Sequence, residues 1–208
     1  MRTRVKMCGF TEPLAIAAAV SAGVDSIGLV LDPSPRQLSL DQAAELMAQI
    51  PPGVATVAVV GRPSLQELRQ IHERLAPSWI QIMADALPSP AEAEGLRLIP
   101  AFEDSEDLVA RVEAYLEQSA DALPLVLVDG PRPGSGIRAD WSRVLSLVPQ
   151  TRLMLAGGIR ADNVAEAIAK VGPYGVDLSS GIERERGIKD PQMVREFMAA
   201  LRAAEVGE

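Results

Sequence analysis

The chain has 208 residues, of which 48% are hydrophobic and only 3% aromatic, and its formal net charge is −8. A nucleic-acid partner normally requires a basic face, so this acidic balance argues against one. No apolar run approaches the roughly 18 residues that cross a membrane, and the N-terminus passes from "MRTR" into a strand without the apolar segment of a signal peptide. We therefore expect a cytoplasmic enzyme or binding protein, with residues 1–208 forming one domain.

Short runs rich in β-branched and apolar residues recur about every 25 residues, which is typical of strands. Eight strands are predicted, over residues 4–9, 26–31, 54–60, 79–83, 97–102, 123–130, 152–158 and 175–180.

The segments between these strands have the apolar spacing of helices. Eight helices are predicted, over residues 12–22, 40–49, 64–75, 88–95, 103–119, 140–148, 161–171 and 190–206. Thr11, Ser39 and Ser64 precede three of them as expected N-caps, and Ser64 with Glu67 fits a capping box.

Eight evenly spaced strand–helix units with no linker between them favour a single (β/α)8 TIM barrel, an α/β fold, over a doubly wound open sheet. No G-x-G-x-x-G turn follows the first strand, which also argues against the open sheet. In a barrel the chemistry lies at the carboxyl ends of the strands, so the last residues of each strand are the candidates for a site.

Cys8, the only cysteine, ends the first predicted strand in "VKMCGFT". Side chains alternate along a strand, so Lys6 shares the face of Cys8, and an ammonium group nearby favours the thiolate form that acts as a base or nucleophile. The alternative is that Cys8 is a small buried apolar residue.

Arg36 ends a loop stiffened by Pro33 and Pro35 after the second strand. A guanidinium held in this way is suited to binding a carboxylate through two hydrogen bonds. The alternative is a solvated arginine on the surface.

Asp129 ends the otherwise apolar sixth strand, "LPLVLVDG". Partial desolvation there favours the protonated carboxyl group, which is suited to a general acid. An aspartate that only binds nearby loop amides is the alternative.

Small residues end the last two strands, in "AGG" with Gly157 and Gly158 and in "SSG" with Ser180 and Gly181. Backbone N–H groups approach an anion closely at such turns, and the loops after strands seven and eight are the usual phosphate site of barrel enzymes. Plain tight turns are the alternative interpretation.

Several stretches, in order, resemble the phosphoribosylanthranilate isomerase family of tryptophan biosynthesis. They are "VKMCGFT", "SPR" at 34–36, "GSGIRADW" from Gly134, "LAGGI" at 155–159, "YGVDLSSGIE" at 174–183 and "GIKD" at 187–190. The resemblance covers nearly the whole chain, and it implies the same single barrel that the strand spacing predicts.

The resemblance implies the Amadori rearrangement of N-(5-phosphoribosyl)anthranilate to 1-(2-carboxyphenylamino)-1-deoxyribulose 5-phosphate, with no redox or metal cofactor. It implies that Asp129 is the general acid that protonates the furanose ring oxygen, and that Cys8 is the base that takes the C2′ proton. Arg36 would hold the anthranilate carboxylate, and the amides around Gly157, Gly158, Ser180 and Gly181 would bind the phosphate. The partner is then a small phosphorylated molecule, and the chain is expected to be a monomer or homodimer.

The sequence departs from the family pattern on one side of the expected pocket. Met83 and Ala84 replace the usual His-Gly after the fourth strand, and the loop between Asp129 and Gly134 is shorter than usual. His72, the only histidine, lies within a predicted helix and is expected at the surface, so it is no substitute.

Two other functions stay open on the sequence. One is a divergent paralogue that acts on a related phosphorylated sugar amine or sugar phosphate, which the departures at Met83 and Ala84 favour. The other is a phosphate-binding module without catalysis, which needs only the glycine turns and leaves the acid and the thiol at two strand ends without a purpose.

Overall fold

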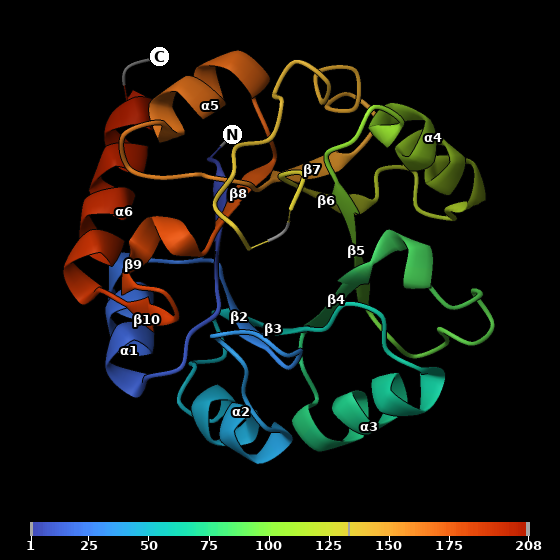
Figure 1. Ribbon diagram of the computed structural model, residues 1–208, viewed down its shortest axis with the longest axis horizontal. Helices are drawn as coiled ribbons and strands as arrows, with labels where there is room; N and C mark the ends of the chain where they lie inside the picture. Colours follow the sequence, from blue (N-terminus) through green and yellow to red (C-terminus); the bar gives the residue numbers. More distant parts are fainter. Residues whose placement is uncertain (1, 133, 207–208) are drawn as a thin grey trace.

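The computed structural model describes residues 2–132 and 134–206. Eight parallel strands close into a barrel in the order β1 to β8, with β8 hydrogen-bonded to β1 (Figure 1). The strands are β1 Arg4–Cys8, β2 Ser26–Val30, β3 Ala55–Val59, β4 Trp79–Met83, β5 Leu98–Glu103, β6 Leu125–Asp129, β7 Arg152–Leu155 and β8 Gly175–Leu178. The predicted fold class is confirmed, and each strand lies within a residue or two of its predicted start.

The α-helices form a ring outside the barrel (Figure 1). Within the described ranges they are α1 Pro13–Ala22, α2 Leu40–Met47, α3 Leu65–Leu75, α4 Leu108–Gln118, α5 Val164–Val171 and α6 Pro191–Val206. Two short 3₁₀ helices, η1 Ala84–Ala86 and η2 Ser180–Ile182, follow β4 and β8. None of the helices in the described part of the chain is long and apolar enough to cross a membrane.

Two of the three predicted N-caps are present. Ser64 and Glu67 form the predicted capping box at α3, and Ser39 forms one with Gln42 at α2. The prediction for Thr11 is wrong: α1 begins after Glu12 without a side-chain cap, and the Thr11 hydroxyl donates instead to the carbonyl of Gly187 at 3.1 Å.

The prediction of a helix over 88–95 is wrong: the segment contains turns and no helix. Ser89 and Glu92 begin one turn as a capping pair. Gly95 then has a φ of +79°, a left-handed conformation that ends a helix, so the turn does not propagate.

The helix predicted over 140–148 is also wrong. The backbone there makes separate i to i+3 hydrogen bonds from Arg143 to Asp140 and from Leu147 to Val144. Trp141, Val144 and Leu147 are nonetheless all buried. Their spacing of three residues matches successive tight turns as well as it matches a helix, so the apolar spacing alone does not distinguish the two.

The predicted helix over 103–119 begins later, at Leu108, because Glu103 still belongs to β5 and the Asp104 carboxylate accepts from the amide of Asp140. A short antiparallel hairpin, β9 Glu183–Glu185 and β10 Ile188–Lys189, follows η2 and was not predicted.

Side chains point alternately into and out of the barrel along each strand, so the hydrophobic core has two parts. The larger part packs the outer faces of the strands against the helices, and includes Phe10, Ile16, Leu29 and Phe197. A smaller cluster fills the barrel interior: Val57, Ile99, Ala101, Leu127, Met154 and Ala156. Polar side chains replace this apolar filling next to β1 and β8, at the carboxyl end of the barrel.

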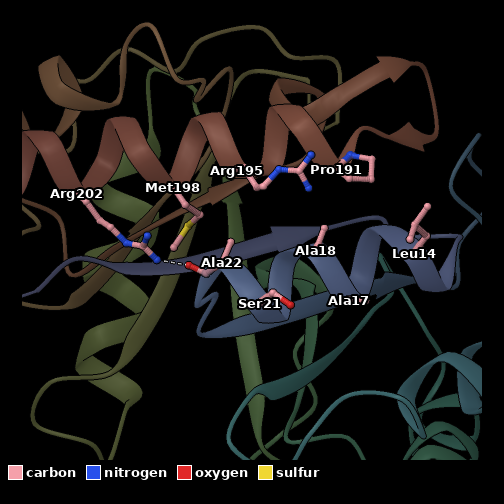
Figure 2. A pocket seen from close by; sticks show the side chains of 9 residues that line it. All are labelled: Leu14, Ala17, Ala18, Ser21, Ala22, Pro191, Arg195, Met198 and Arg202. Carbon is pink, nitrogen blue, oxygen red and sulfur yellow. Dashed lines mark hydrogen bonds between the residues drawn. The ribbon is translucent and has the colours of Figure 1, made fainter.

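A groove of about 670 Å³ lies on the helical layer between α1 and α6 (Figure 2). Small side chains such as Ala17 and Ala18 line it, with Leu14 at one end and Arg202 bound to the carbonyl of Ala22 at the other. No strand end contributes to this groove, so it lies outside the region in which barrel chemistry is expected.

Candidate active site

A cavity of about 450 Å³ opens at the carboxyl ends of the strands, and Cys8, Arg36 and Asp129 all line it. A smaller adjoining cavity of about 30 Å³ is lined by Gly157, Gly158 and Ser180. The two cavities share four lining residues: Asp129, Gly134, Asp177 and Ser179. The structure therefore brings together all of the predicted site residues but Gly181, which lines neither cavity.

Cys8 is buried at the end of β1, 8% exposed. Gly28 on β2 makes room for it, because a Cβ at Gly28 would lie 2.8 Å from the Cys8 Sγ. Burial raises the pKa of the Cys8 thiol above its ordinary value, although the charges of Lys6, Lys189 and Arg36 lower it in part. Lys6 thus favours the thiolate, as expected from the sequence, but burial outweighs it, and at neutral pH the free protein holds mainly the thiol.

Lys6 has a closer partner than Cys8. Its Nζ donates to Asp177 Oδ2 at 2.9 Å, and both side chains are buried inside the barrel. Burial by itself would lower the pKa of Lys6, but the charges of Asp177 and Cys8 raise it. The ammonium group is thus protonated, and Asp177 is its direct ion-pair partner.

Asp129 ends β6, half-buried, with its Oδ1 accepting from the amide of Gly130 at 2.7 Å. Burial raises the pKa of Asp129 to about 6, and the hydrogen bonds from the loop amides of Gly130 and Gly134 lower it only in part. The binding of a loop amide and the retention of a proton are thus compatible in one side chain. It binds a loop amide, and it retains a proton more readily than an ordinary carboxylate.

Arg36 is not a solvated surface arginine, because its side chain is only 7% exposed. Its Nε and Nη2 donate to the two carboxylate oxygens of Glu183 at 2.7 and 2.9 Å, and its Nη1 donates to the carbonyl of Gly134 at 3.3 Å. Gly9 allows this position, since a Cβ there would lie 2.4 Å from the Arg36 Cδ. The planar fork of the guanidinium is therefore occupied by a carboxylate of the protein itself.

Lys189 binds the same carboxylate from the other side. Its Nζ donates to Glu183 Oε1 at 2.7 Å and to both the carbonyl and the hydroxyl of Ser179 at 2.9 Å. Burial lowers the pKa of Lys189 to about 8, while Glu183 raises it in part. Burial would raise the pKa of Glu183, but the hydrogen bonds from Arg36 and Lys189 outweigh it and lower that pKa. This buried chain of ions connects the loop after β2 to the turn after β8.

The glycine turns are tightly packed against one another. A Cβ at Gly157 would lie 2.5 Å from the amide nitrogen of Gly130, and one at Gly158 would lie 2.8 Å from the carbonyl of Gly136. Both glycines have positive φ, +80° and +67°. Their own amides donate to no backbone carbonyl among the described residues, and they border the smaller cavity.

Gly181 has a packing reason of its own. A Cβ there would lie 2.2 Å from the carbonyl of Ile159. The absence of a side chain at this position is therefore explained without a ligand.

Part of the remaining wall of the larger cavity is apolar and is formed by Val30, Pro33, Val59, Met83 and Ala101. Arg62 and Asp85 form an exposed ion pair at 2.9 Å between the loops after β3 and β4. His72 lies in α3 and lines neither cavity at the strand ends. In the described ranges no group of three or more His, Cys, Asp or Glu side chains is arranged to hold a metal ion.

Comparison with known proteins gives a consistent match. The family model for N-(5'-phosphoribosyl)anthranilate (PRA) isomerase matches residues 5–200. The chain belongs to the phosphoribosylanthranilate isomerase family.

Individual members of the family match over nearly their whole length. The N-(5'-phosphoribosyl)anthranilate isomerase of Azotobacter vinelandii is 38% identical over 97% of this chain and 98% of its own. That of Leptothrix cholodnii is 36% identical over 98% of this chain and 93% of its own.

Solved structures of the family have the same fold. The phosphoribosyl anthranilate isomerase of Thermotoga maritima superposes with a TM-score of 0.86 at 28% identity, over 97% of this chain and 99% of its own. Another, in complex with reduced 1-(o-carboxyphenylamino)-1-deoxyribulose 5-phosphate, has a TM-score of 0.82 at 28% identity, over 97% and 99% of the two chains.

The two residues that replace the usual His-Gly of the phosphoribosylanthranilate isomerase pattern differ in their position relative to the cavity. Met83 lines the larger cavity, whereas Ala84 begins η1 and lies outside it. Of the two substituted positions, only Met83 is therefore placed to contact a ligand. The shortened loop after Asp129 includes residue 133, which lies outside the described residues.

Three charged residues at or next to the candidate site were not predicted from the sequence: Asp177, Glu183 and Lys189. All three occur in the stretches "GVDLSSGIE" and "GIKD" that carry the family resemblance. A charged residue inside an apolar strand was a usable signal for Asp177. Glu183 and Lys189 gave no such signal. They lie in a charged stretch of the chain, and Arg36, the other partner of Glu183, is 147 residues away.

Proposed function

We propose that this chain catalyses the Amadori rearrangement of N-(5-phosphoribosyl)anthranilate to 1-(2-carboxyphenylamino)-1-deoxyribulose 5-phosphate in tryptophan biosynthesis. One observation carries the proposal: a thiol and a proton-retaining carboxyl group line one cavity that continues into the glycine turns of a family barrel. This combination suits the donation of a proton to an oxygen atom and the removal of a proton from a carbon atom of a phosphorylated sugar.

In the proposed mechanism Asp129 is the general acid. Its raised pKa keeps a proton available near neutral pH for the furanose ring oxygen. Protonation of that oxygen allows the bond between it and C1′ to break, and the nitrogen lone pair forms the C1′=N double bond. Asp129 is left as the carboxylate.

Cys8 is the proposed base for the second proton transfer. It takes the proton from C2′ of the opened sugar, and the electrons of that C–H bond form an enol as the C1′=N bond becomes a single bond. The enol then tautomerises to the ketone of the product: its C2′ hydroxyl loses a proton to solvent, and C1′ gains a proton from solvent. Because burial raises the thiol pKa, the reactive thiolate is the minor form in the free protein.

We propose that the phosphate lies in the smaller cavity, held by the amides around Gly157, Gly158, Ser180 and Gly181. The amides of Gly157 and Gly158 border the smaller cavity and donate to no backbone carbonyl among the described residues, which supports this placement. Arg36 is the proposed contact for the anthranilate carboxylate, through the N–H groups that Glu183 and Gly134 leave unused.

We further propose that residues 1–208 form one domain that works as a monomer or homodimer in the cytoplasm. Both states occur among similar structures: one, 26% identical with a TM-score of 0.84, is of monomers generated from the dimeric isomerase of Thermotoga maritima. Sedimentation equilibrium of the purified chain measures the number of copies.

Complementation of a tryptophan auxotroph that lacks this isomerase tests the proposal. The wild-type gene should restore growth without tryptophan, and a Cys8→Ala gene expressed to the same level should not. If the wild-type gene fails while the protein is present and folded, the isomerase proposal is wrong.

A divergent paralogue acting on a related phosphorylated sugar amine is the second candidate, and Met83 in the apolar wall favours it. This candidate predicts no growth in the complementation and measurable turnover of phosphoribosyl amines with another aromatic group. Growth of the complemented strain would argue against it.

A further inference from the structure

Three arginines line the larger cavity: Arg36, Arg62 and Arg186. Only two of them have an acidic partner in the described part of the chain. Glu183 occupies the fork of Arg36, and Asp85 accepts from both Nε and Nη2 of Arg62, at 3.3 and 2.9 Å. Arg186 makes neither a hydrogen bond nor an ion pair with any residue that the structure describes.

The backbone next to Arg186 is nevertheless held in place. Arg186 lies at the tip of the β9–β10 hairpin, where the next residue, Gly187, has a φ of +93°. The carbonyl of Gly187 accepts from the Thr11 hydroxyl at 3.1 Å, and a Cβ at Gly187 would lie 2.5 Å from the carbonyl of Pro35. The tip is therefore packed against the loop that carries Arg36, and the Arg186 side chain reaches the same cavity.

The acidic side chains of the cavity limit where the carboxylate of a ligand can lie. Asp32, Glu103, Asp129 and Asp177 also line it. Asp32 accepts from the amide of Gly61, Asp129 from that of Gly130, and Asp177 from Lys6. Glu103 ends β5, which is on the opposite side of the closed barrel from β1. A ligand carboxylate is thus repelled on the β5 side and attracted toward Arg36 and Arg186.

We propose that Arg186 binds the carboxylate on the aromatic ring of the substrate, together with Arg36. This inference rests on the proposed function, since it assigns a contact to one end of that substrate. Arg36 retains at most two of its five N–H donors, because Glu183 occupies Nε and Nη2 and the carbonyl of Gly134 accepts from Nη1. Arg186, in contrast, donates to none of the described residues, so its guanidinium can bind both oxygens of a carboxylate.

Binding of two ligands to purified wild-type and variant proteins tests this inference. The probes are reduced 1-(o-carboxyphenylamino)-1-deoxyribulose 5-phosphate and the same compound without its carboxyl group. Arg186→Gln should weaken binding of the first probe about tenfold, the loss of one charge-assisted contact, and leave binding of the second unchanged. Arg184→Gln is the matched control, because it removes the same charge from the same hairpin at a residue that does not line the cavity.

In steady-state turnover Arg186→Gln should raise KM by a similar factor, with kcat close to that of the wild type. Equal effects of Arg186→Gln on both probes, or equal effects of the two arginine variants on the first, would overturn the role of Arg186. Absence of turnover by the wild-type protein would instead overturn the proposed function, so the two failures are distinguishable.

Discussion

Glu183 binds Arg36 through both oxygens of its carboxylate, at 2.7 and 2.9 Å, although the two residues are 147 positions apart in the chain. Its Oε1 also accepts from Lys189, which in turn binds Ser179. One buried carboxylate thus fixes the loop after β2 relative to the turn after β8. The carboxylate end and the phosphate end of the proposed site are held by the same group.

Glu183→Gln should therefore destabilise the protein. The change leaves two buried cations, Arg36 and Lys189, without their shared counterion, a loss of about 3–5 kcal/mol in the free energy of unfolding. Urea unfolding at pH 7 measures it. Glu185 on the same hairpin is exposed, so Glu185→Gln should change the free energy of unfolding little. If both variants shift the unfolding midpoint equally, the buried network does not stabilise the fold.

Cys8→Ala and Asp129→Asn should each lower kcat by about 10²–10⁴-fold, because each removes one proton-transfer group. Both side chains lie at the end of a strand next to the cavity and are not part of the hydrophobic core of the barrel interior. The far-ultraviolet circular dichroism of both variants should thus match that of the wild type. Turnover near the wild-type rate in both would eliminate this assignment of acid and base.

The two raised pKa values predict an unusual pH profile of kcat/KM. The active form needs Asp129 protonated, with a pKa of about 6, and Cys8 deprotonated, with a pKa above the ordinary thiol value. Below pH 6 only the thiolate fraction changes, so kcat/KM falls as the pH falls.

Between the two pKa values the gain in thiolate is offset by the loss of protonated Asp129, and kcat/KM is level. Above the thiol pKa it falls again. Initial rates at low substrate concentration between pH 5 and 10 measure the profile. A kcat/KM that stays level down to pH 5, as an ordinary carboxyl pKa of about 4 would give, would contradict it.

Gly28→Ala should impair catalysis through Cys8. The added methyl group would lie 2.8 Å from the Cys8 Sγ, so the thiol must move or β2 must shift. We expect a loss of kcat of at least tenfold with a loss of stability of about 1–3 kcal/mol. Gly53→Ala is the control, because nothing lies within 4 Å of a Cβ there. A kcat unchanged from the control would indicate that the thiol position is unimportant.

Much of the barrel could be predicted because its strands are short, apolar and regularly spaced. The capping boxes at Ser39 and Ser64 could be read from four residues each. The turns around Trp141 could not be predicted, because apolar residues three positions apart fit both a helix and a series of separate turns. The strands of the β9–β10 hairpin are too short to show an alternation of polar and apolar residues in the sequence.

The site could be located from the sequence, but its electrostatics could not. Spacing placed Lys6 near Cys8, yet the stronger partner of Lys6 is Asp177, which becomes its neighbour only when β8 pairs with β1. Likewise, nothing near Arg36 in the chain indicates that Glu183 occupies its guanidinium. Local sequence reports which groups are present, whereas closure of the barrel sets which charges neutralise one another.

The spectroscopic isomerase assay of the purified wild-type protein, with the labile substrate generated in situ, tests the central claim most directly. We predict enzyme-dependent conversion of N-(5-phosphoribosyl)anthranilate to 1-(2-carboxyphenylamino)-1-deoxyribulose 5-phosphate, abolished by Asp129→Asn. A folded wild-type protein that converts this substrate no faster than buffer alone would contradict the claim.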